Sequence, residues 1–266
     1  MESPTFEPCA EPWISPTDPT VAAAPVGVRH VLLEDNGRYT LPEDFDGLAV
    51  FWWRGRPVAQ AWPLAAAGGP NAGQVDADTL SKVAAEEQRA QPARLDASVV
   101  ICTRDRPEEL QRCLGSLPRQ TLRPAEVIVV DNASRDMRTR DVALAAGVIY
   151  VRENRPGLDI ARNTGARRAR SSIVAYTDDD VLLHPTWLER LVAAFDAPQI
   201  GAVTGLVLPA ELATDAQRHF ETHWGFGRGY RRKDFDAARF RSQCDDVFHA
   251  WEIGAGASMA FRRDVF

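Results

Sequence analysis

Three adjacent aspartates, Asp178, Asp179 and Asp180, have the residue type and spacing that most clearly point to chemistry in this sequence. Neighbouring carboxylates repel one another, and a hard divalent cation such as Mg²⁺ or Mn²⁺ relieves the repulsion because it prefers oxygen ligands. In extended backbone successive side chains point to opposite sides, so we expect Asp178 and Asp180 on one side and Asp179 on the other. Such a pair could place one carboxylate on a metal ion and the other near a ribose or a metal-bound water. The alternative is a solvated acidic turn before a helix that Pro185 is expected to begin.

A further aspartate, Asp131, ends an apolar run in the segment Val-Val-Asp-Asn-Ala-Ser. Its carboxylate could accept hydrogen bonds from the N–H of a uracil or guanine ring, or from ribose hydroxyls. The alternative is an Asx turn that leads into the next helix. The segment Thr103-Arg104-Asp105-Arg106-Pro107 also follows an apolar run, and an arginine there could stack on a base. Ordinary capping of the next helix is the competing interpretation of that loop.

Four arginines gather around Pro156-Gly157 and the helix predicted after it, and an anionic diphosphate needs such positive charge beside it. They are Arg155, Arg162, Arg167 and Arg168. A helical face rich in arginine is usually only solvated. We therefore assign a binding role to Arg162 alone, which lies near the start of this helix.

Apolar runs of strand length alternate with amphipathic helical patterns from Ala97 onward, and this alternation predicts the elements that position these residues. The runs are Ala97–Cys102, Val127–Val130, Gly147–Val151, Ile173–Tyr176 and Ile200–Leu208. Strands that alternate with helices form βαβ units, so we predict an α/β fold with a mostly parallel sheet and helices on both faces. Ligands of such sheets bind beyond the carboxyl ends of the strands. The aspartates follow the first, second and fourth runs, so we expect them to converge at one edge.

The residues before this pattern fall into two parts. Residues 1–25 are rich in proline, which resists helix and central strand alike, and we expect a flexible tail. Residues 26–95 are expected to form a small accessory α/β domain, with a helix over Asp78–Arg89 and a hairpin of Leu48–Trp53 and Pro57–Trp62 around Gly55. The tryptophans of this domain could stack on sugar, but core packing is the simpler interpretation. Residues 96–266 form the second predicted domain.

The composition narrows the classes of partner. The 266 residues carry a formal net charge of -6, which disfavours a broad nucleic-acid surface. The four cysteines are scattered and form no Cys-x-x-Cys pair, so we predict neither a disulfide framework nor a zinc site. No apolar stretch approaches the ~18 residues of a membrane-spanning helix, and the N-terminus lacks the pattern of a signal peptide. We expect a cytoplasmic protein and leave peripheral contact with the inner face of the membrane open.

Five segments in this order, spread over about residues 97–266, resemble the family 2 glycosyltransferases of the GT-A fold. They are Val99–Pro107, residues 129–134, Gly157–Asn163, Thr177–Asp180 and Gly254–Arg263. Each motif alone is weak, but the five in sequence are specific. The resemblance implies the Rossmann-like sheet of nucleotide-diphospho-sugar transferases, a UDP-, GDP- or dTDP-sugar donor, and Mg²⁺ or Mn²⁺. It also implies an inverting transfer to a hydroxyl of a glycan, a lipid or a small molecule.

The same resemblance implies roles for individual positions. Asp131 would hold the base, and Asp178 would approach the ribose or a metal-bound water. Asp180 would bind the metal that bridges both phosphates. The nucleotide-binding residues would be Thr103, Arg104, Asp105, Asp131, Arg162 and Asp178, the metal ligands Asp180 and Asp178, and the acceptor-side residues Ala257 and Ser258.

Two departures from the family pattern affect the expected activity. Ser258 stands where many relatives carry asparagine, which changes the expected acceptor contacts. The general base of the family usually lies in a Glu-Asp segment shortly after the Met-Ala-Phe-Arg-Arg strand, and this chain ends at Phe266 before any such segment. Asp245, Asp246 and Glu252 are nearby carboxylates outside that motif. We therefore expect the general base to lie outside this chain, which would then be truncated at its C-terminus.

Three other functions stay open at this point. Without its base, the chain could be an inactive module that binds a nucleotide sugar. A nucleotidyltransferase is the nearest enzymatic alternative, but its first strand would lead into a glycine-rich basic loop, and Thr103–Pro107 contains no glycine. Asp178-x-Asp180 also fits an aspartyl phosphatase. That motif normally follows the first strand, however, and Lys233 is the only lysine after it in this sequence.

Overall fold

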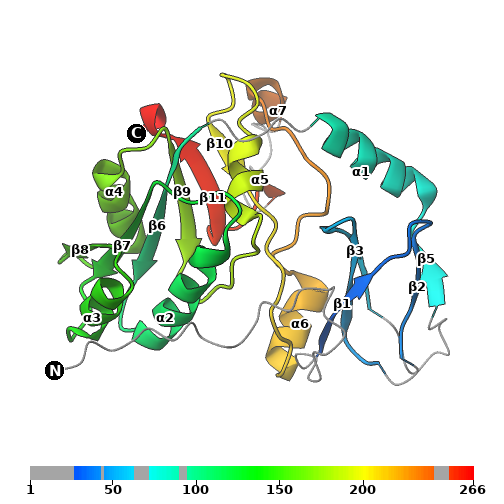
Figure 1. Cartoon of the computed structure of the whole chain (residues 1–266), viewed down its shortest axis with the longest axis horizontal. Helices are drawn as coiled ribbons and strands as arrows, with labels where there is room; N and C mark the ends of the chain where they lie inside the picture. The colour runs from blue at the N-terminus through cyan, green and yellow to red at the C-terminus, as the bar shows by residue number, and fades with distance from the viewer. Residues whose placement is uncertain (1–26, 43–44, 63–71, 90–94, 243–251) are drawn as a thin grey trace. The chain divides into compact units, whose positions relative to one another are not determined.

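The computed structural model describes residues 27–42, 45–62, 72–89, 95–242 and 252–266 (Figure 1). The tail predicted at residues 1–25 lies outside these ranges. The described residues form two compact units: residues 95–205 and 254–266 make the first, and residues 27–89 and 206–253, with their gaps, make the second. The sequence analysis placed residues 206–253 in the second predicted domain, whereas here they group with residues 27–89. The boundaries of the folding domains stay a prediction.

The first unit is built on a six-stranded sheet with the strand order β10-β11-β9-β6-β7-β8. Its strands are β6 (Ala97–Thr103), β7 (Glu126–Asn132), β8 (Ile149–Glu153), β9 (Ile173–Asp178), β10 (Ala202–Thr204) and β11 (Ser258–Arg262). Strands β6 to β9 pair in parallel, while β11 pairs antiparallel with both β9 and β10. The central strands are almost wholly buried, as expected for a sheet that is covered on both faces. The predicted α/β fold with a mostly parallel sheet is confirmed.

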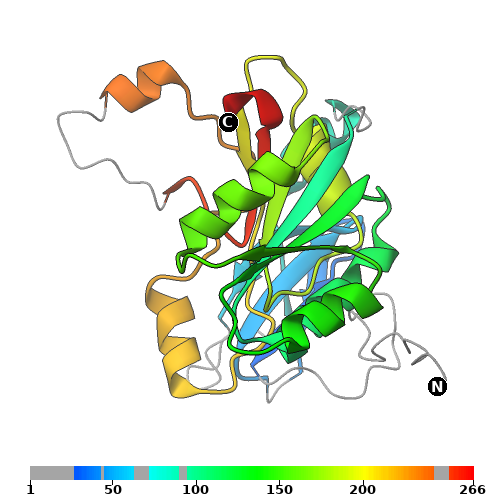
Figure 2. The ribbon, with the colours of Figure 1, turned by 90° about the vertical axis from the view of Figure 1, so that its left-hand side faces the viewer.

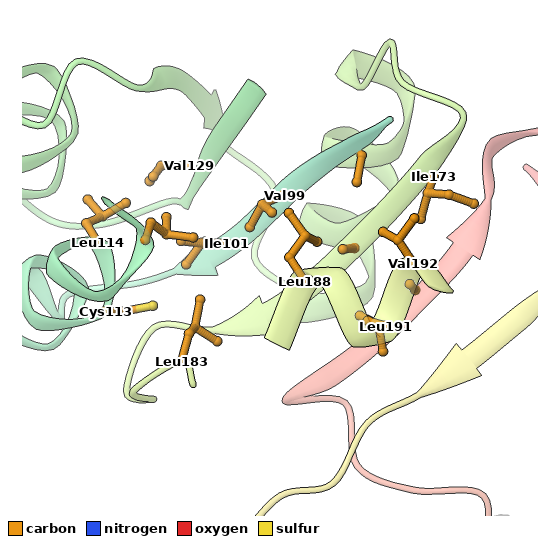
Figure 3. Close-up of a cluster of buried hydrophobic side chains, with 14 of the residues drawn as sticks. Val99, Ile101, Cys113, Leu114, Val129, Ile173, Leu183, Leu188, Leu191 and Val192 are labelled. Carbon is orange, nitrogen blue, oxygen red and sulfur yellow. The ribbon is translucent and has the colours of Figure 1, made fainter. Parts of the chain in front are cut away.

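Helices lie on both faces of this sheet (Figure 2). They are α2 (Pro107–Ser116), α3 (Arg138–Ala145), α4 (Leu158–Arg168) and α5 (Trp187–Ala193), with 3-10 helices at Leu117–Arg119 and Arg263–Val265. Leu110 of α2 and Leu188 of α5 share one buried cluster with Val99 and Ile101 of β6, and Figure 3 shows part of it. Val100 lies between Val99 and Ile101 in the sequence and belongs to the cluster on the other face, together with Ala161 of α4. The alternation of β6 side chains therefore supports a core on each face.

Helix α4 lies close to the sheet because Gly165 has no side chain. A Cβ atom at this position would stand 2.3 Å from Cγ1 of Val100 and 3.3 Å from Cγ2 of Val130. Real Cβ atoms do not approach other atoms so closely, so the glycine is required for this packing. The contact fixes the distance of α4 from β6 and β7, and with it the position of Arg162 on the preceding turn.

The second unit contains two small sheets, ordered β1-β3-β4 and β2-β5. Its elements are β1 (Val28–Leu32), β2 (Arg38–Thr40), β3 (Leu48–Trp53), β4 (Arg56–Ala61), β5 (Ala72–Gln74), α1 (Ala77–Arg89), α6 (Asp215–His223) and α7 (Ala237–Ser242). The predicted hairpin is confirmed as β3-β4, and Arg54 and Gly55 take the positive φ values of 50° and 74° that its two-residue turn requires. Of the three tryptophans interpreted as core residues, Trp52 and Trp53 are buried, whereas Trp62 is only partly buried.

Two predicted elements of the first unit are shorter than expected. Only Ala202–Thr204 of the run Ile200–Leu208 forms a strand, because β10 is an edge strand and pairs with β11 over these residues alone. The helix expected from Pro185 begins at Trp187, after a turn in which the N–H of Trp187 donates to the carbonyl of His184. Within the described ranges, none of the helices is both long and apolar enough to span a membrane.

Candidate functional site

The carboxyl ends of β6, β7 and β9 lie side by side at one edge of the six-stranded sheet. Thr103 at the end of β6 is the register partner of Asp131 in β7, and Cys102 is the partner of Asp178 in β9. Because the strands are parallel and end at the same level, the loops that follow them are neighbours. The convergence expected from the sequence is therefore present in the structure.

The aspartates after β9 alternate in exposure. The side chains of Asp178 and Asp180 are 40% and 51% exposed, while that of Asp179 is 7% exposed. The exposure alternates as expected, but the expected extended backbone ends at Asp178, and Asp179 and Asp180 lie in the turn that follows β9. Asp178 and Asp180 are thus the two carboxylates of the triplet that a ligand from solvent can reach.

The buried Asp179 pairs with Arg106, the residue just before helix α2. Nη1 of the guanidinium lies 3.3 Å from a carboxylate oxygen of Asp179 and 3.1 Å from one of Asp180. Burial raises the pKa of Asp179, while the Thr103 hydroxyl and the Arg106 guanidinium oppose that rise. The carboxylate of Asp179 in turn raises the pKa of Arg106. One guanidinium therefore serves a buried carboxylate and an exposed one together.

Arg162 of α4 reaches the same edge of the sheet. Its Nη2 lies 3.6 Å from a carboxylate oxygen of Asp178, and its side chain is 21% exposed. Burial raises the pKa of Asp178, and the positive charge of Arg162 opposes the rise. Gly256 lies against the guanidinium, since a Cβ atom there would stand 2.6 Å from Nη2. The start of α4 and the segment before β11 thus meet at Asp178.

The structure separates Arg162 from its neighbours in the sequence. Arg155 pairs with Glu153 in the preceding strand, at 3.1 Å, and Arg167 donates to the hydroxyl of Thr164 on the same helix. These contacts are local, and the two arginine side chains are exposed. Of the arginines in this described segment, Arg162 is the one that contacts the aspartates after β9, so its selection from the sequence agrees with the geometry.

Asp131 at the end of β7 is fully buried, and the protein itself occupies both of its oxygens. Oδ1 accepts a hydrogen bond from the backbone N–H of Ser134 at 3.0 Å, and Oδ2 accepts from Tyr150 and Arg152, both at 2.7 Å. Burial raises the pKa of Asp131, but these hydrogen bonds outweigh burial and leave the pKa below its ordinary value. Here Asp131 fixes a turn and an arginine, and a direct contact with a base stays a prediction.

Asp105 joins the loop after β6 to the loop after β7. Its φ is 56°, its backbone N–H donates to the hydroxyl of Ser134, and its carboxylate accepts from the backbone N–H of Arg135 at 2.7 Å. Thr103 is buried beneath this loop, whereas the side chain of Arg104 is 50% exposed. Three of the residues predicted to bind the nucleotide, Thr103, Arg104 and Asp105, are thus consecutive at the end of β6, and Arg104 presents the most accessible side chain among them.

Asn132 ties the end of β7 to the loop before α4. Its side-chain amide donates to the carbonyl of Arg155 and accepts from the N–H of Gly157, both at 2.8 Å. Gly157 has a φ of 143°, a backbone conformation that favours glycine. The amide thereby sets the position at which α4 begins. The helix starts at Leu158, four residues before Arg162.

The two residues predicted for the acceptor side differ in exposure. The side chain of Ser258 is buried and accepts a hydrogen bond from Nε1 of Trp187 at 2.9 Å. Gly205 packs directly on it, because a Cβ atom at Gly205 would stand 2.3 Å from the Ser258 hydroxyl oxygen. Ala257 is partly exposed. Ser258 therefore serves the packing of β11, and an acceptor role for either residue stays a prediction.

The exposed carboxylates suit a cation that arrives with a phosphate ligand. Mg²⁺ usually binds through one or two protein carboxylates and completes its shell with water and substrate phosphates. Asp178 and Asp180 supply that donor set. Within the described part of the chain, no three His, Cys, Asp or Glu side chains gather into a metal centre of their own. The residues present thus fit a substrate-bridging Mg²⁺ or Mn²⁺ better than a structural metal.

The carboxylates considered for the general base give no assignment. Asp245 and Asp246 lie outside the described residues. Glu252 lies in the second unit and forms an ion pair with Arg239 of α7 at 3.5 Å. The base of the reaction therefore stays unassigned.

Two side chains at this edge, Arg152 and Tyr150, were missed in the sequence, and a third, Arg106, was considered only as a possible partner of a base. Arg152 is the register partner of Asp131, so an arginine lies opposite an aspartate on adjacent strands, and Tyr150 lies two residues before it. This pairing becomes visible only when the register is known. Arg106 stands between the first strand and the helix that begins at Pro107, which already places it at the carboxyl edge. Its side chain could have been considered with the aspartates on that ground.

Comparison with known proteins gives a consistent family. The family model described as glycosyl transferase family 2 matches residues 98–266. Glycosyltransferase AglE of Haloferax volcanii is 33% identical over 118 residues, which cover 41% of this chain and 38% of that protein. Validoxylamine A glucosyltransferase of Streptomyces hygroscopicus subsp. limoneus is 39% identical over 109 residues, which cover 38% and 24%. Each match spans less than half of the relative's own length.

Solved structures show only distant similarity. Mannosyltransferase PcManGT from Pyrobaculum calidifontis, solved with GDP-Man and Mn²⁺, has a TM-score of 0.46 and 22% identity, over 70% of this chain and 52% of that one. Glucosyl-3-phosphoglycerate synthase from Mycobacterium tuberculosis, solved with UDP, has a TM-score of 0.44 and 20% identity, over 65% and 58%. The assignment therefore depends on the family model, which covers more than half of the chain and every aspartate of the site. On that ground, the chain belongs to glycosyl transferase family 2.

Proposed function

We propose that this chain transfers a sugar from a nucleotide-diphosphate donor to an acceptor hydroxyl, with Mg²⁺ or Mn²⁺ as cofactor and with inversion at the anomeric carbon. The observation that carries the proposal is the exposed pair Asp178 and Asp180 at the end of β9, flanked by Arg162 and Arg106. A diphosphate has several negative oxygens, and a carboxylate-bound cation beside arginines can neutralise them. Membership in the family supports the reaction class.

The exposed carboxylates divide the work of holding the donor. Asp180 coordinates the cation, and Asp178, oriented by Arg162, accepts a hydrogen bond from a ribose hydroxyl or a metal-bound water. When bound, the cation supplies Lewis-acid stabilisation of the leaving diphosphate. Arg162 is placed to contact the same diphosphate, since its guanidinium is partly exposed beside Asp178.

The nucleoside end of the donor lies against the loop Thr103–Asp105. The half-exposed guanidinium of Arg104 offers a flat surface on which a base can stack. Asp131 contributes through the turn at Ser134 and through Arg152, because both of its oxygens already accept hydrogen bonds from the protein. The donor is a UDP-, GDP- or dTDP-sugar.

The acceptor, a glycan, a lipid or a small molecule, approaches from the side of Ala257. A cytoplasmic location belongs to the same proposal, with peripheral contact at the inner face of the membrane in the case of a lipid acceptor. The inactive nucleotide-sugar-binding module is the competing function. It predicts donor binding without any transfer or hydrolysis of the sugar.

The substitution Asp180→Asn tests the proposal, because it removes the charge of the proposed ligand and keeps the size of the side chain. We expect the affinity for the nucleotide diphosphate in the presence of Mn²⁺ to fall about tenfold or more, as the loss of one charged contact implies. Calorimetric titration of UDP, GDP and dTDP, with and without Mn²⁺, measures the effect.

The matched control is Asp141→Asn, an identical change of charge at an exposed position of α3. We expect it to leave the affinity unchanged. Wild-type protein that binds none of the three nucleotides, or binds them equally well without Mn²⁺, would contradict the proposal. Binding together with a complete absence of turnover on UDP- and GDP-sugars would favour the inactive module.

A further inference from the structure

Arg106 is shared between two carboxylates that differ sharply in their surroundings. The same nitrogen, Nη1, lies 3.3 Å from Asp179 and 3.1 Å from Asp180, whose side chains are 7% and 51% exposed. A buried carboxylate depends strongly on its partner, because an unpaired charge away from water is unfavourable. An exposed ion pair contributes little, because water replaces the partner readily. The contact with Asp179 is therefore the anchor, and the contact with Asp180 is the exchangeable one.

The exchangeable contact lies on the carboxylate that the proposed function assigns to the cation. A divalent cation on Asp180 would stand within a few ångströms of a guanidinium that still contacted the same carboxylate. The two positive charges repel at that distance, and Arg106 also occupies one of the oxygens that the cation needs. Arg106 can turn away from Asp180 and keep its contact with Asp179, because its own side chain is 54% exposed.

We propose that Arg106 is an exchangeable counter-ion of Asp180. It holds this carboxylate while no cation is bound, releases it when the cation and the diphosphate arrive together, and then faces the diphosphate from its anchor on Asp179. Arg106 is thus a positioning residue that weakens cation binding in the absence of nucleotide. The inference rests on the proposed function, because it takes Asp180 as a cation ligand.

The proposal has a thermodynamic consequence that can be measured without any turnover. The cation must displace Arg106 when it binds alone, whereas a diphosphate supplies new partners for the displaced guanidinium. Binding of the cation and binding of the diphosphate therefore strengthen each other, and by linkage the factor is the same in both directions. Removal of the Arg106 charge should strengthen binding of the cation alone and reduce this factor.

The experiment is a titration of Mn²⁺ into the full chain, followed through the electron paramagnetic resonance signal of the free ion. It is made with wild type and with Arg106→Gln, each without nucleotide and with saturating UDP or GDP. We expect Arg106→Gln to bind Mn²⁺ alone about tenfold more tightly, since a unit positive charge has left the neighbourhood of the ion. We also expect the nucleotide to improve Mn²⁺ affinity by a smaller factor in the variant than in wild type.

Arg106→Lys is the second variant, because Arg106→Gln leaves Asp179 buried without its partner and could impair folding. Lysine keeps the charge beside Asp179 but is a single point of contact and cannot hold both carboxylates with the same geometry. We expect its affinity for Mn²⁺ alone to lie between those of wild type and Arg106→Gln, about threefold tighter than wild type. A purely structural role of Arg106 would not produce tighter Mn²⁺ binding in either variant.

Asp180→Asn separates failure of this inference from failure of the proposed function. Mn²⁺ binding that is lost in Asp180→Asn but unchanged or weaker in both Arg106 variants overturns the inference and leaves the proposed function in place. Mn²⁺ binding that is absent from all variants, with and without nucleotide, overturns both. Loss in Asp180→Asn together with tighter binding in the Arg106 variants supports both.

Discussion

The ends of β7 and β9 lie on either side of β6 and carry the same residue type in opposite states. At the end of β7, Asp131 is fully buried and accepts hydrogen bonds from Tyr150 and Arg152 at 2.7 Å. At the end of β9, Asp178 is 40% exposed and has an arginine at 3.6 Å. The first carboxylate is fully occupied by the protein, while the second keeps room for a ligand.

The difference shows that position at a strand end does not by itself give a carboxylate its role. Hydrogen bonds hold the pKa of Asp131 below its ordinary value, so its negative charge stabilises the folded state. Burial raises the pKa of Asp178, so its negative charge opposes folding and is suited to a cation. The end of β7 contributes to stability, and under the proposed function the end of β9 binds the donor.

The largest effect is expected from Asp131→Asn. Both oxygens of Asp131 accept hydrogen bonds, from Ser134 on one side and from Tyr150 and Arg152 on the other. The asparagine amide carries no charge, and its NH₂ group would place a donor against a donor on one of these sides. We expect the free energy of unfolding to fall by about 3 kcal/mol, the scale found when one partner of a buried ion pair is removed. Urea denaturation measures it.

Asp178→Asn is the matched change at the open end. Because burial raises the pKa of Asp178, neutralising it should not lower the free energy of unfolding. Equal destabilisation by Asp131→Asn and Asp178→Asn would break the comparison between the two strand ends.

A pH series sharpens the same contrast with a smaller effect. The pKa of Asp131 lies below the ordinary value of 3.8, so the unfolded chain takes up this proton at higher pH than the folded protein does. The stabilisation is therefore complete above about pH 4 and is lost as the pH falls further. We expect the difference in unfolding free energy between wild type and Asp131→Asn to narrow below about pH 4. A difference that widened there would have the wrong sign.

Among the changes that destabilise the protein, the smallest effect is expected from Tyr150→Phe, which removes one of the hydrogen bonds to Asp131 and leaves Arg152 in place. The phenol hydroxyl is near the edge of the sheet, where water can replace it in part. We expect a loss of about 1 kcal/mol in the free energy of unfolding, the usual net contribution of a single hydrogen bond. A loss as large as that of Asp131→Asn would mean that the hydrogen bond from Tyr150, and not the contact with Arg152, provides most of the stabilisation by Asp131.

Much of the fold followed from patterns that are local in the sequence. The apolar runs before Thr103, Asp131 and Asp178 predicted three parallel strands with aspartates beyond their ends, because period and length alone identify buried strands between helices. The hairpin around Gly55 followed from its turn residues. The extent of β10 did not, because an edge strand ends where its neighbour ends, and the partner β11 lies more than fifty residues later.

The states of the site residues could not be predicted from the sequence in the same way. That Asp131 is occupied depends on Arg152, which comes opposite to it only through the register of β7 and β8. That Arg106 bridges Asp179 and Asp180 depends on the turn that begins α2, a contact across 73 and 74 residues. Ser258 is buried and accepts a hydrogen bond from Trp187, 71 residues away in the sequence, while its acceptor role stays a prediction. Such contacts are set by tertiary packing, which no local pattern contains.

The side chain of Asn132 imposes an unusually strict chemical requirement on its position. It must donate a hydrogen bond to the carbonyl of Arg155 and accept one from the N–H of Gly157. The side chain therefore bonds as a peptide group would, between the end of β7 and the loop that leads into α4. Aspartate has the right shape but would meet the Arg155 carbonyl with a second acceptor, and leucine would leave both peptide groups without partners. Only an amide of this length serves both. A side chain of the same size therefore fails at position 132 if it lacks either the donor or the acceptor.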